Sequence, residues 1–495
     1  MKVKLFTTEK ELRITNNKPI ISQLIKRTLL LTLTTLGATQ TFTTTSNTIE
    51  SRKLIKKHKP LSPPLKRQQK QQINLSHLKQ APETVKNGPN PFFPFDPIRG
   101  YIDIYDKNNS MWYWLVRARH NHSTAPLIIF LEGGPGGASS EDFTGASGPL
   151  TFRNYSNSHP KAYLKGSTSW AEKANLLYPD FPLGVGFSTV TSEYLSYDGK
   201  QAQEQILLFF EKFLEIFPEF KNRPIFVAGI SYGGHWVPYT AYALKYAQNP
   251  DINVKGFYIS SGLIDYQKAV DSYISFALAN FKYTGFTEAD ATPWKKVISL
   301  CQHMGRLCPK HPLLTVDRYK VCEDKGFLAM MAEIRQKKPK FNNKDISGDF
   351  HFDLSNIEFL NNSQVINFLK VRKRHFEPIN MTFFYFFAPK DGFVPMQPLL
   401  ARLLDDGVKG VVAAGRLDFI CNYMQSEAAV ASIGWKWREE YNRVKMGVCP
   451  PGGLCKEFKN LREYRVDGSG HGIGYFRPEV AAEIINSLID WEPYL

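Results

Sequence analysis

A short apolar run followed at once by a glycine-flanked serine constrains this chain more than any other feature. Residues 225–228 read Ile-Phe-Val-Ala, which predicts a strand buried on both faces, and the motif Gly229–Gly233 (Gly-Ile-Ser-Tyr-Gly) follows directly. Residues 237–246 are compatible with a helix. In a strand–turn–helix setting, the glycines permit a tight turn that presents the Ser231 hydroxyl at the carboxyl edge of a sheet. The alternative is a serine in an ordinary strand-to-helix turn.

Other segments repeat this alternation of strand and helix. Residues 127–131 are wholly apolar, and apolar residues recur at helical spacing over 201–219. The rhythm continues with a helix over 397–406, a strand over 408–414 and a helix over 478–491. We therefore predict an α/β fold, with a mostly parallel central sheet and helices on both of its faces.

Composition divides the chain into four segments. Residues 1–80 are expected to hold a targeting segment and a basic disordered linker, because residues 51–80 cannot bury a core. Residues 81–264 and 381–495 are expected to form the two parts of the α/β core. Residues 265–380 are helical in pattern, charged and cysteine-containing, which predicts an inserted helical cap.

The positive charge is concentrated outside the predicted core. The net charge is +16, but residues 1–80 hold 16 Lys and Arg against 3 Asp and Glu, so the remaining 415 residues carry only +3. A nearly neutral core does not favour nucleic acid as a partner.

The N-terminal region favours a secretory route. Lys26-Arg27 precedes a short, threonine-diluted apolar stretch, which is the order of a signal peptide; a transit peptide or an unprocessed extension is the competing interpretation. No run of about 18 apolar residues occurs, so we expect no membrane-spanning bundle and no stable membrane partner. Six Asn-x-Ser/Thr sequons also favour secretion and glycosylation. They begin at Asn74, Asn108, Asn121, Asn154, Asn361 and Asn380.

A nucleophilic serine needs a base and a group that orients the base. Residues 411–414 predict a strand that leads to Asp418, and the glycine-rich loop 468–472 holds His471. In this chain order we expect His471 to take the proton of Ser231 and Asp418 to fix the imidazole tautomer. Each residue alone would more often be structural, but their order at strand ends favours a triad.

A tetrahedral oxyanion needs two fixed N–H donors. We expect one from the amide of Tyr232 and the other from the loop 133–137, with Gly134 as the donor. A phosphate cradle is the alternative for this loop, but no Gly-Lys-Ser/Thr follows it. The chain has no Cys-x-x-Cys pair, so we predict no metal site.

From about residue 92 to the C-terminus, the chain resembles the serine carboxypeptidases, a family with the α/β-hydrolase fold. Ordered motifs carry the resemblance. They are Gly100–Asp103, Gly133–Gly136, Asn175–Tyr178, Gly184–Ser188, Ser231–Pro238, Asp418–Asn422, Gly470-His471 and Pro478-Glu479. The resemblance implies a cofactor-free acid exopeptidase that is secreted, vacuolar or lysosomal and releases C-terminal residues from peptides. It also implies the same triad and the same oxyanion donors.

The chain departs from the family where the substrate's terminal carboxylate is held. Family exopeptidases use an Asn or Gln and two Glu there; this chain has Glu132, Ile230 and, with a one-residue gap, Ala146. Ile230 cannot hydrogen-bond a carboxylate and ionised Glu132 would repel it, whereas protonated Glu132 could donate a hydrogen bond. The residues expected to contact substrate are Glu132, Gly133, Ile230 and Cys421.

The resemblance also bears on the cysteines. Cys421 matches a free thiol beside the family's substrate pocket, and Gly137 replaces a cysteine that the family uses in a disulfide. The expected disulfides are Cys449–Cys455 and one pair among Cys301, Cys308 and Cys322.

Three functions remain open. The first is a serine carboxypeptidase active at acidic pH. The second keeps the machinery but changes the substrate, as an acyltransferase, an esterase or another peptidase, with Glu132 attracting a substrate amine. The third is a non-catalytic binding protein on the same scaffold. A homodimer is also left open.

Overall fold

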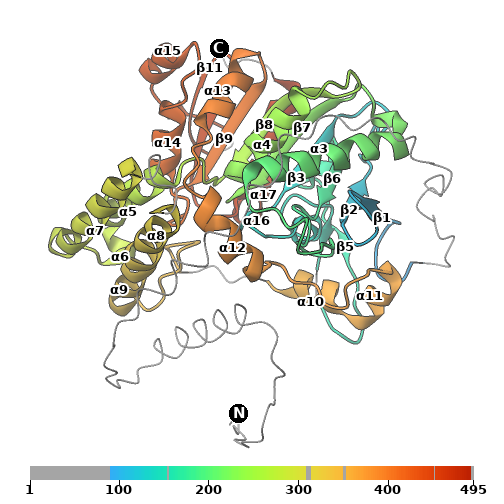
Figure 1. Ribbon diagram of the computed structural model, residues 1–495, viewed down its shortest axis with the longest axis horizontal. Helices are drawn as coiled ribbons and strands as arrows, with labels where there is room; N and C mark the ends of the chain where they lie inside the picture. Colours follow the sequence, from blue (N-terminus) through green and yellow to red (C-terminus); the bar gives the residue numbers. More distant parts are fainter. Residues whose placement is uncertain (1–89, 153–154, 308–313, 349–352, 451, 492–495) are drawn as a thin grey trace, which may run out of the picture. The chain divides into compact units, whose positions relative to one another are not determined.

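The computed structural model describes residues 90–152, 155–307, 314–348, 353–450 and 452–491 (Figure 1). The predicted targeting segment and linker at 1–80 lie outside these residues, as do Asn74, Asn154 and Cys308.

A ten-stranded sheet forms the centre of the fold. In spatial order its strands are β1 (Ile98–Asp103), β2 (Ser110–Val116), β6 (Asn175–Pro179), β3 (Leu127–Leu131), β7 (Pro224–Ile230), β8 (Asn253–Ser260), β9 (Lys409–Gly415), β12 (Leu461–Val466), β11 (Gly453–Phe458) and β10 (Gly447–Val448). The strands from β6 to β12 run parallel, and antiparallel pairs close both ends of the sheet. The predicted mostly parallel sheet is therefore confirmed. A separate pair consists of β4 (Leu150–Thr151) and β5 (Tyr163–Leu164).

Helices cover both faces of the sheet, which explains why β3 is apolar and buried at every position. Figure 1 shows α3 (Gly199–Ile216), α4 (Gly233–Lys245) and α13 (Gln397–Asp405) in front of the sheet and α17 (Pro478–Asp490) behind it. The predicted helix at 237–246 begins earlier, at Gly233. Gly233 and Gly234 are poor helix formers and hid its first turn in the sequence.

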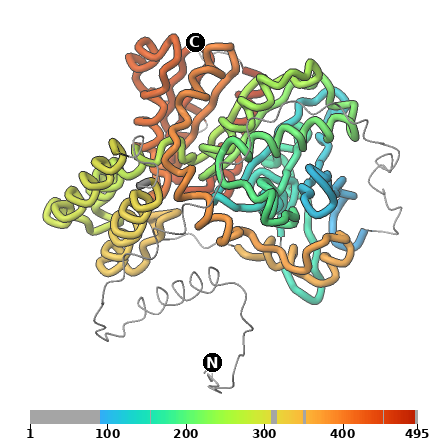
Figure 2. The backbone as a smooth tube through the Cα atoms, in the orientation of Figure 1, coloured from blue at the N-terminus to red at the C-terminus, as the bar shows by residue number. Residues whose placement is uncertain are grey.

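The predicted insertion contains helices in two groups. The first group consists of α5 (Tyr266–Ala279), α6 (Phe281–Thr284), α7 (Glu288–Leu307), α8 (Leu314–Cys322), the π-helical turn η6 (Glu323–Leu328) and α9 (Ala329–Lys337). It has its own apolar core and projects from one end of the sheet (Figure 2). The second group, α10 (Ser355–Asn361) and α11 (Ser363–Leu369), packs on the main core.

Shorter elements connect these layers. They are α2 (Ser139–Phe143), η4 (Trp170–Glu172), η5 (Pro218–Phe220), α12 (Met381–Asp391), α14 (Tyr423–Ala431), α15 (Arg438–Arg443) and α16 (Ile473–Phe476). None of the helices in the described ranges is long and apolar enough to cross a bilayer.

Two disulfides match the expected pairing. Cys301–Cys322 joins α7 to the end of α8, and Cys449–Cys455 ties β11 to the segment before it. Cys421 is free, as expected, and it is buried.

Candidate active site

Ser231 stands in a strained turn directly after β7. Its φ of 60° lies in the left-handed region that non-glycine residues rarely adopt. The turn is fixed by backbone hydrogen bonds: the Ser231 amide donates to Ser260 O at 3.1 Å, and the Ser231 carbonyl accepts from the amides of Gly234 at 2.9 Å and Leu263 at 2.8 Å. Backbone strain held by its surroundings is typical of a nucleophile elbow.

The glycines around this turn are required because neighbouring backbone segments approach it too closely for a Cβ atom. A Cβ at Gly229 would lie 2.7 Å from the carbonyl oxygen of Leu131 in the neighbouring strand β3. A Cβ at Gly133 would lie 2.5 Å from the Ser231 Cβ and 2.8 Å from the Tyr232 nitrogen. The glycine-rich loop therefore lies against Ser231, where a substrate carbonyl would be attacked.

His471 and Asp418 form the hydrogen bond that a triad requires. His471 Nδ1 and Asp418 Oδ2 are 2.8 Å apart, and the Asp418 side chain is fully buried. The Cys421 amide donates to the other Asp418 oxygen at 3.1 Å. Because Asp418 is held on both oxygens, it can fix the orientation of the imidazole.

The segment around Lys344 supports the histidine loop, a contact that no sequence pattern predicts. The His471 amide donates to Lys344 O at 2.7 Å, and a Cβ at Gly470 would lie 2.2 Å from the same oxygen. No pattern in the charged stretch around Lys344 distinguishes it from an ordinary surface loop.

Ser231 follows β7 and His471 follows β12, and the strands β8 and β9 lie between these two in the sheet. Within the described residues the two side chains make no hydrogen bond with each other, whereas the His471–Asp418 bond is formed. Catalytic hydrogen bonds are often long in unliganded enzymes and tighten when substrate binds.

An acidic corner, defined as Glu132, Glu141 and Asp142, occupies the place of the family's carboxylate clamp; Asp142 is buried, and the two glutamates are half-buried. Glu132 Oε1 accepts a hydrogen bond from the Gly133 amide at 3.0 Å. Burial, together with the charges of Glu141 and Asp142, raises the pKa of Glu132 well above its ordinary value, against the opposing effects of that amide and Lys344. Burial also raises the pKa of Glu141 to about 7.

The other two clamp positions contribute no hydrogen-bonding side chain. Ile230 is half-buried at the end of β7, and Ala146 is buried. Ala146 packs against α16, the helix that follows the His471 loop, since a Cβ at Gly474 would lie 2.8 Å from the Ala146 Cβ. The motif position of Glu132 predicts its place in the site, whereas Glu141 and Asp142 occupy no motif position that would predict theirs.

A pocket of about 90 Å³ opens beside Ser231. Its lining includes both predicted oxyanion donors, Gly134 and Tyr232, and also Cys421. Burial, with the nearby Asp418 charge, raises the pKa of the Cys421 thiol well above its ordinary value. Cys421 is therefore a neutral wall of the pocket rather than a competing nucleophile.

A second group of buried polar residues supports Tyr232. Asp391 of α12 accepts hydrogen bonds from Tyr232 Oη at 2.7 Å, Tyr239 Oη at 2.8 Å and His235 Nδ1 at 2.9 Å. More than 150 residues separate Asp391 from each partner. Sequence spacing therefore gives no sign of the contact.

The described residues contain no group of three or more His, Cys, Asp or Glu side chains placed to hold a metal ion.

A strained serine, an Asp–His pair and a glycine-rich loop at the carboxyl edge of a parallel sheet define a protein of the serine α/β-hydrolase class. A family model described as serine carboxypeptidase matches residues 87–491. The chain belongs to the serine carboxypeptidase family.

Individual relatives are distant. The chain is 24% identical over 411 residues to the vacuolar serine-type carboxypeptidase ATG42 of Saccharomyces cerevisiae, covering 79% of this chain and 78% of that protein. It is 26% identical over 427 residues to the pheromone-processing carboxypeptidase kex1 of Aspergillus oryzae, covering 79% of this chain and 65% of that protein.

The crystal structure of the prohormone-processing carboxypeptidase Kex1Δp from Saccharomyces cerevisiae superposes with a TM-score of 0.65 at 20% identity. The superposition covers 80% of this chain and 91% of that chain and shows the shared fold.

Proposed function

We propose that this protein is a serine-type carboxypeptidase that releases C-terminal amino acids from peptides at acidic pH. The observation that carries the proposal is the 2.8 Å His471–Asp418 bond, at the same sheet edge as the strained Ser231. Family membership supports the same chemistry.

The reaction proceeds through an acyl-enzyme. His471 Nε2 takes the Ser231 Oγ proton while Oγ attacks the scissile carbonyl carbon. The amides of Gly134 and Tyr232 hold the resulting oxyanion. His471 then gives its proton to the departing amine, which leaves as the free C-terminal amino acid. Water, deprotonated by His471, releases the acyl group and restores Ser231.

Two substitutions test the mechanism. Ser231→Ala and His471→Ala should each lower kcat by at least about 10⁴-fold while circular dichroism remains unchanged. An active-site phosphonate should label the wild-type protein at Ser231. Turnover that survives either substitution contradicts the mechanism, and failure of Ser231 to label supports a non-catalytic binding protein instead.

A second candidate keeps this machinery but does not require a free carboxylate. The acidic corner favours it, since Glu132 ionises when the pH exceeds its raised pKa and then repels a carboxylate and attracts an amine. The turnover of a blocked dipeptide with a free C-terminal carboxylate, compared with that of its C-terminal amide and ester, discriminates between the two candidate functions. A strong preference for the free acid supports the exopeptidase, and equal or faster turnover of the amide or ester supports the second candidate.

The secretory pathway is the proposed route of the protein, with a lysosomal, vacuolar or extracellular destination. Two disulfides support it, because they persist in oxidising compartments. One relative is described as vacuolar.

A further inference from the structure

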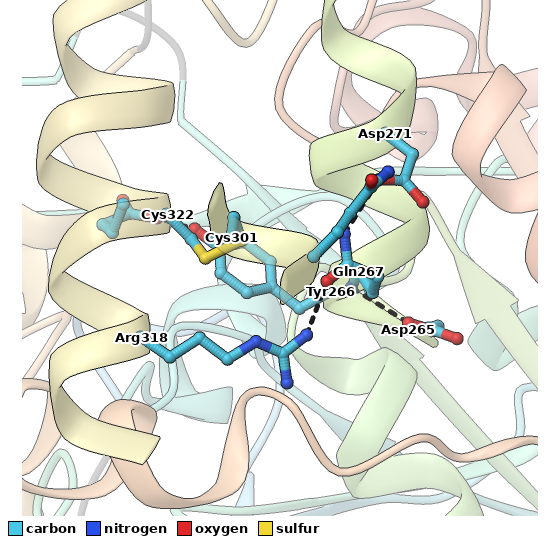
Figure 3. The surroundings of a disulfide bond; sticks show 9 residues. Asp265, Tyr266, Gln267, Asp271, Cys301, Arg318 and Cys322 are labelled. Carbon is cyan, nitrogen blue, oxygen red and sulfur yellow. Dashed lines mark hydrogen bonds between the residues drawn. A yellow bond between two sulfur atoms is a disulfide. The ribbon is translucent and has the colours of Figure 1, made fainter. Parts of the chain in front are cut away.

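A carboxylate that belongs to no recognised motif lines the pocket beside Ser231. Glu323 begins the π-helical turn η6, immediately after the disulfide cysteine Cys322. Figure 3 shows this disulfide beside the Tyr266 ring. Tyr266 donates a hydrogen bond from its hydroxyl to Glu323 Oε2. The adjacent disulfide therefore anchors the backbone at Glu323, and one of its carboxylate oxygens already accepts a hydrogen bond.

Aromatic rings surround this carboxylate. Tyr266, Tyr273, Tyr319 and Phe327 line the same pocket as Glu323 and Ser231. Tyr266 lies 6.0 Å from Tyr319, and Tyr273 lies 4.7 Å from Phe327, between ring centroids. Aromatic faces attract cations and also pack against an aliphatic stem.

Glu323 lacks a cationic partner. Within the described residues its side chain bonds to Tyr266 and forms no ion pair with a Lys, Arg or His side chain, and burial raises its pKa to about 7. The nearby Arg318 is engaged elsewhere: its guanidinium stacks 3.6 Å from the Phe393 ring centroid and donates to Gln267 at 2.5 Å (Figure 3). A desolvated carboxylate without a counter-ion gains from a ligand that brings one.

We propose that this pocket binds a basic side chain, Lys or Arg, of the substrate residue on the acyl side of the scissile bond. The cation of the ligand favours the ionised form of Glu323, which then pairs with it, and the tyrosine rings flank the aliphatic stem. The acyl side follows from the lining, which includes Gly134 and Tyr232 but not Glu132, Ile230 or Ala146 at the leaving-group side. The assignment rests on the proposed function and names its substrate class.

Blocked dipeptides that carry lysine or norleucine on the acyl side test the assignment, because the two side chains share a stem and differ in charge. The wild-type protein should show a kcat/KM at least about 10-fold higher for lysine. Glu323→Gln should lose that preference while turnover of the norleucine substrate stays within about 2-fold. Glu323→Lys should favour glutamate over norleucine instead.

Glu333→Gln is the matched control, because Glu333 accepts from Trp294 Nε1 at 3.0 Å on α9 and does not line the pocket. It should leave the lysine preference unchanged. A lysine-to-norleucine ratio near one in the wild-type protein, or an unchanged ratio in Glu323→Gln, overturns the assignment.

Binding separates this assignment from the proposed reaction. Calorimetry with the Ser231→Ala variant should show tighter binding of the lysine peptide than of the norleucine peptide, and Glu323→Gln in that background should equalise the two. This result supports the proposed specificity of the pocket for a basic side chain even if no peptide is hydrolysed. Equal affinities in the Ser231→Ala variant refute it, even if hydrolysis occurs.

Discussion

An imidazole can serve Ser231 only in one tautomer, and Asp418 is the residue that imposes it. Its Oδ2 lies 2.8 Å from His471 Nδ1, which leaves Nε2 available to accept the serine proton. We expect Asp418→Asn to keep the fold but lower kcat by about 10⁴-fold, as the equivalent change does in the chymotrypsin class.

Asp467→Asn is the control for this prediction, since Asp467 is half-exposed and paired with Arg416 at the surface. The kcat of Asp467→Asn, measured by steady-state kinetics with an ester substrate, should stay near that of the wild-type protein. Equal losses in both variants would show that Asp418 acts through general stability.

Glu132 gives a second prediction, on pH dependence. Because its pKa is raised, Glu132 is neutral at acidic pH and ionises as the pH rises through the raised value. The KM for a free-acid substrate should therefore increase with pH, whereas Glu132→Gln should give a flatter profile. The C-terminal amide is the control substrate, and its KM should not follow this titration. A wild-type KM independent of pH for the free acid would falsify this role.

The sequence predicted residues whose roles follow from local motifs. Ser231, Asp418 and His471 follow predicted strands in a recognisable order, and the structure places the latter two in contact. Glu323 and Asp391 have no such motif, because their contacts join segments distant in the chain. Sequence periodicity describes neighbours on one element and is silent about such contacts.

At the scale of elements, Asp391 couples α12 to α4. Burial alone would raise the pKa of Asp391, but the hydrogen bond and charge of His235 and the hydroxyls of Tyr232 and Tyr239 outweigh it and hold the pKa below its ordinary value. A carboxyl with a lowered folded pKa stabilises the protein above its unfolded pKa, and this contribution is lost as the pH falls through the folded value.

We therefore expect Asp391→Asn to lower the free energy of unfolding by about 3 kcal/mol at pH 7. The difference from wild type should shrink as the pH falls below about 4. Urea denaturation at a series of pH values measures it. Asp490→Asn, at an exposed ion pair with Lys173, is the control and should have little effect. A difference that grows in acid would contradict the predicted sign.

The two disulfides should contribute unequally to the free energy of unfolding. Cys301–Cys322 closes a sequence separation of 21 residues and Cys449–Cys455 one of 6. Loop-closure entropy gives about 3 kcal/mol for the first and about 2 kcal/mol for the second. Replacing each pair with serines and measuring urea unfolding should give losses in that order, and the reverse order would contradict the entropic account.

Element boundaries were less predictable than element types. The strand predicted at 408–414 lies at Lys409–Gly415, and the helix predicted at 478–491 ends at Asp490. The separation of α10 and α11 from α5–α9 could not be read from composition, because both groups are polar helices whose packing partners lie elsewhere in the chain.

At the scale of the whole molecule, the sequons provide a test of the secretory route. Asn108 and Asn121 are exposed in turns. By contrast, Asn361 Nδ2 donates to Phe376 O at 3.0 Å, and Asn380 Nδ2 donates to Gly184 O at 3.1 Å. Both side chains are half-buried. A glycan on Asn361 would replace one of the two N–H groups that donate to Ile357 O and Phe376 O, and a glycan on Asn380 would crowd its contact with Gly184 O.

We therefore expect protein from a eukaryotic secretory host to carry glycans at Asn108 and Asn121 and to be unmodified at Asn361 and Asn380. Peptide mapping before and after enzymatic deglycosylation measures the occupancy of each site. Asn108→Gln with Asn121→Gln should remove both glycans without changing Ser231 labelling by a phosphonate, since both turns lie outside the pocket lining. Folded, secreted protein that is fully glycosylated at Asn380 would contradict the prediction, because the Asn380 side chain also caps α12 by accepting from the Phe383 amide.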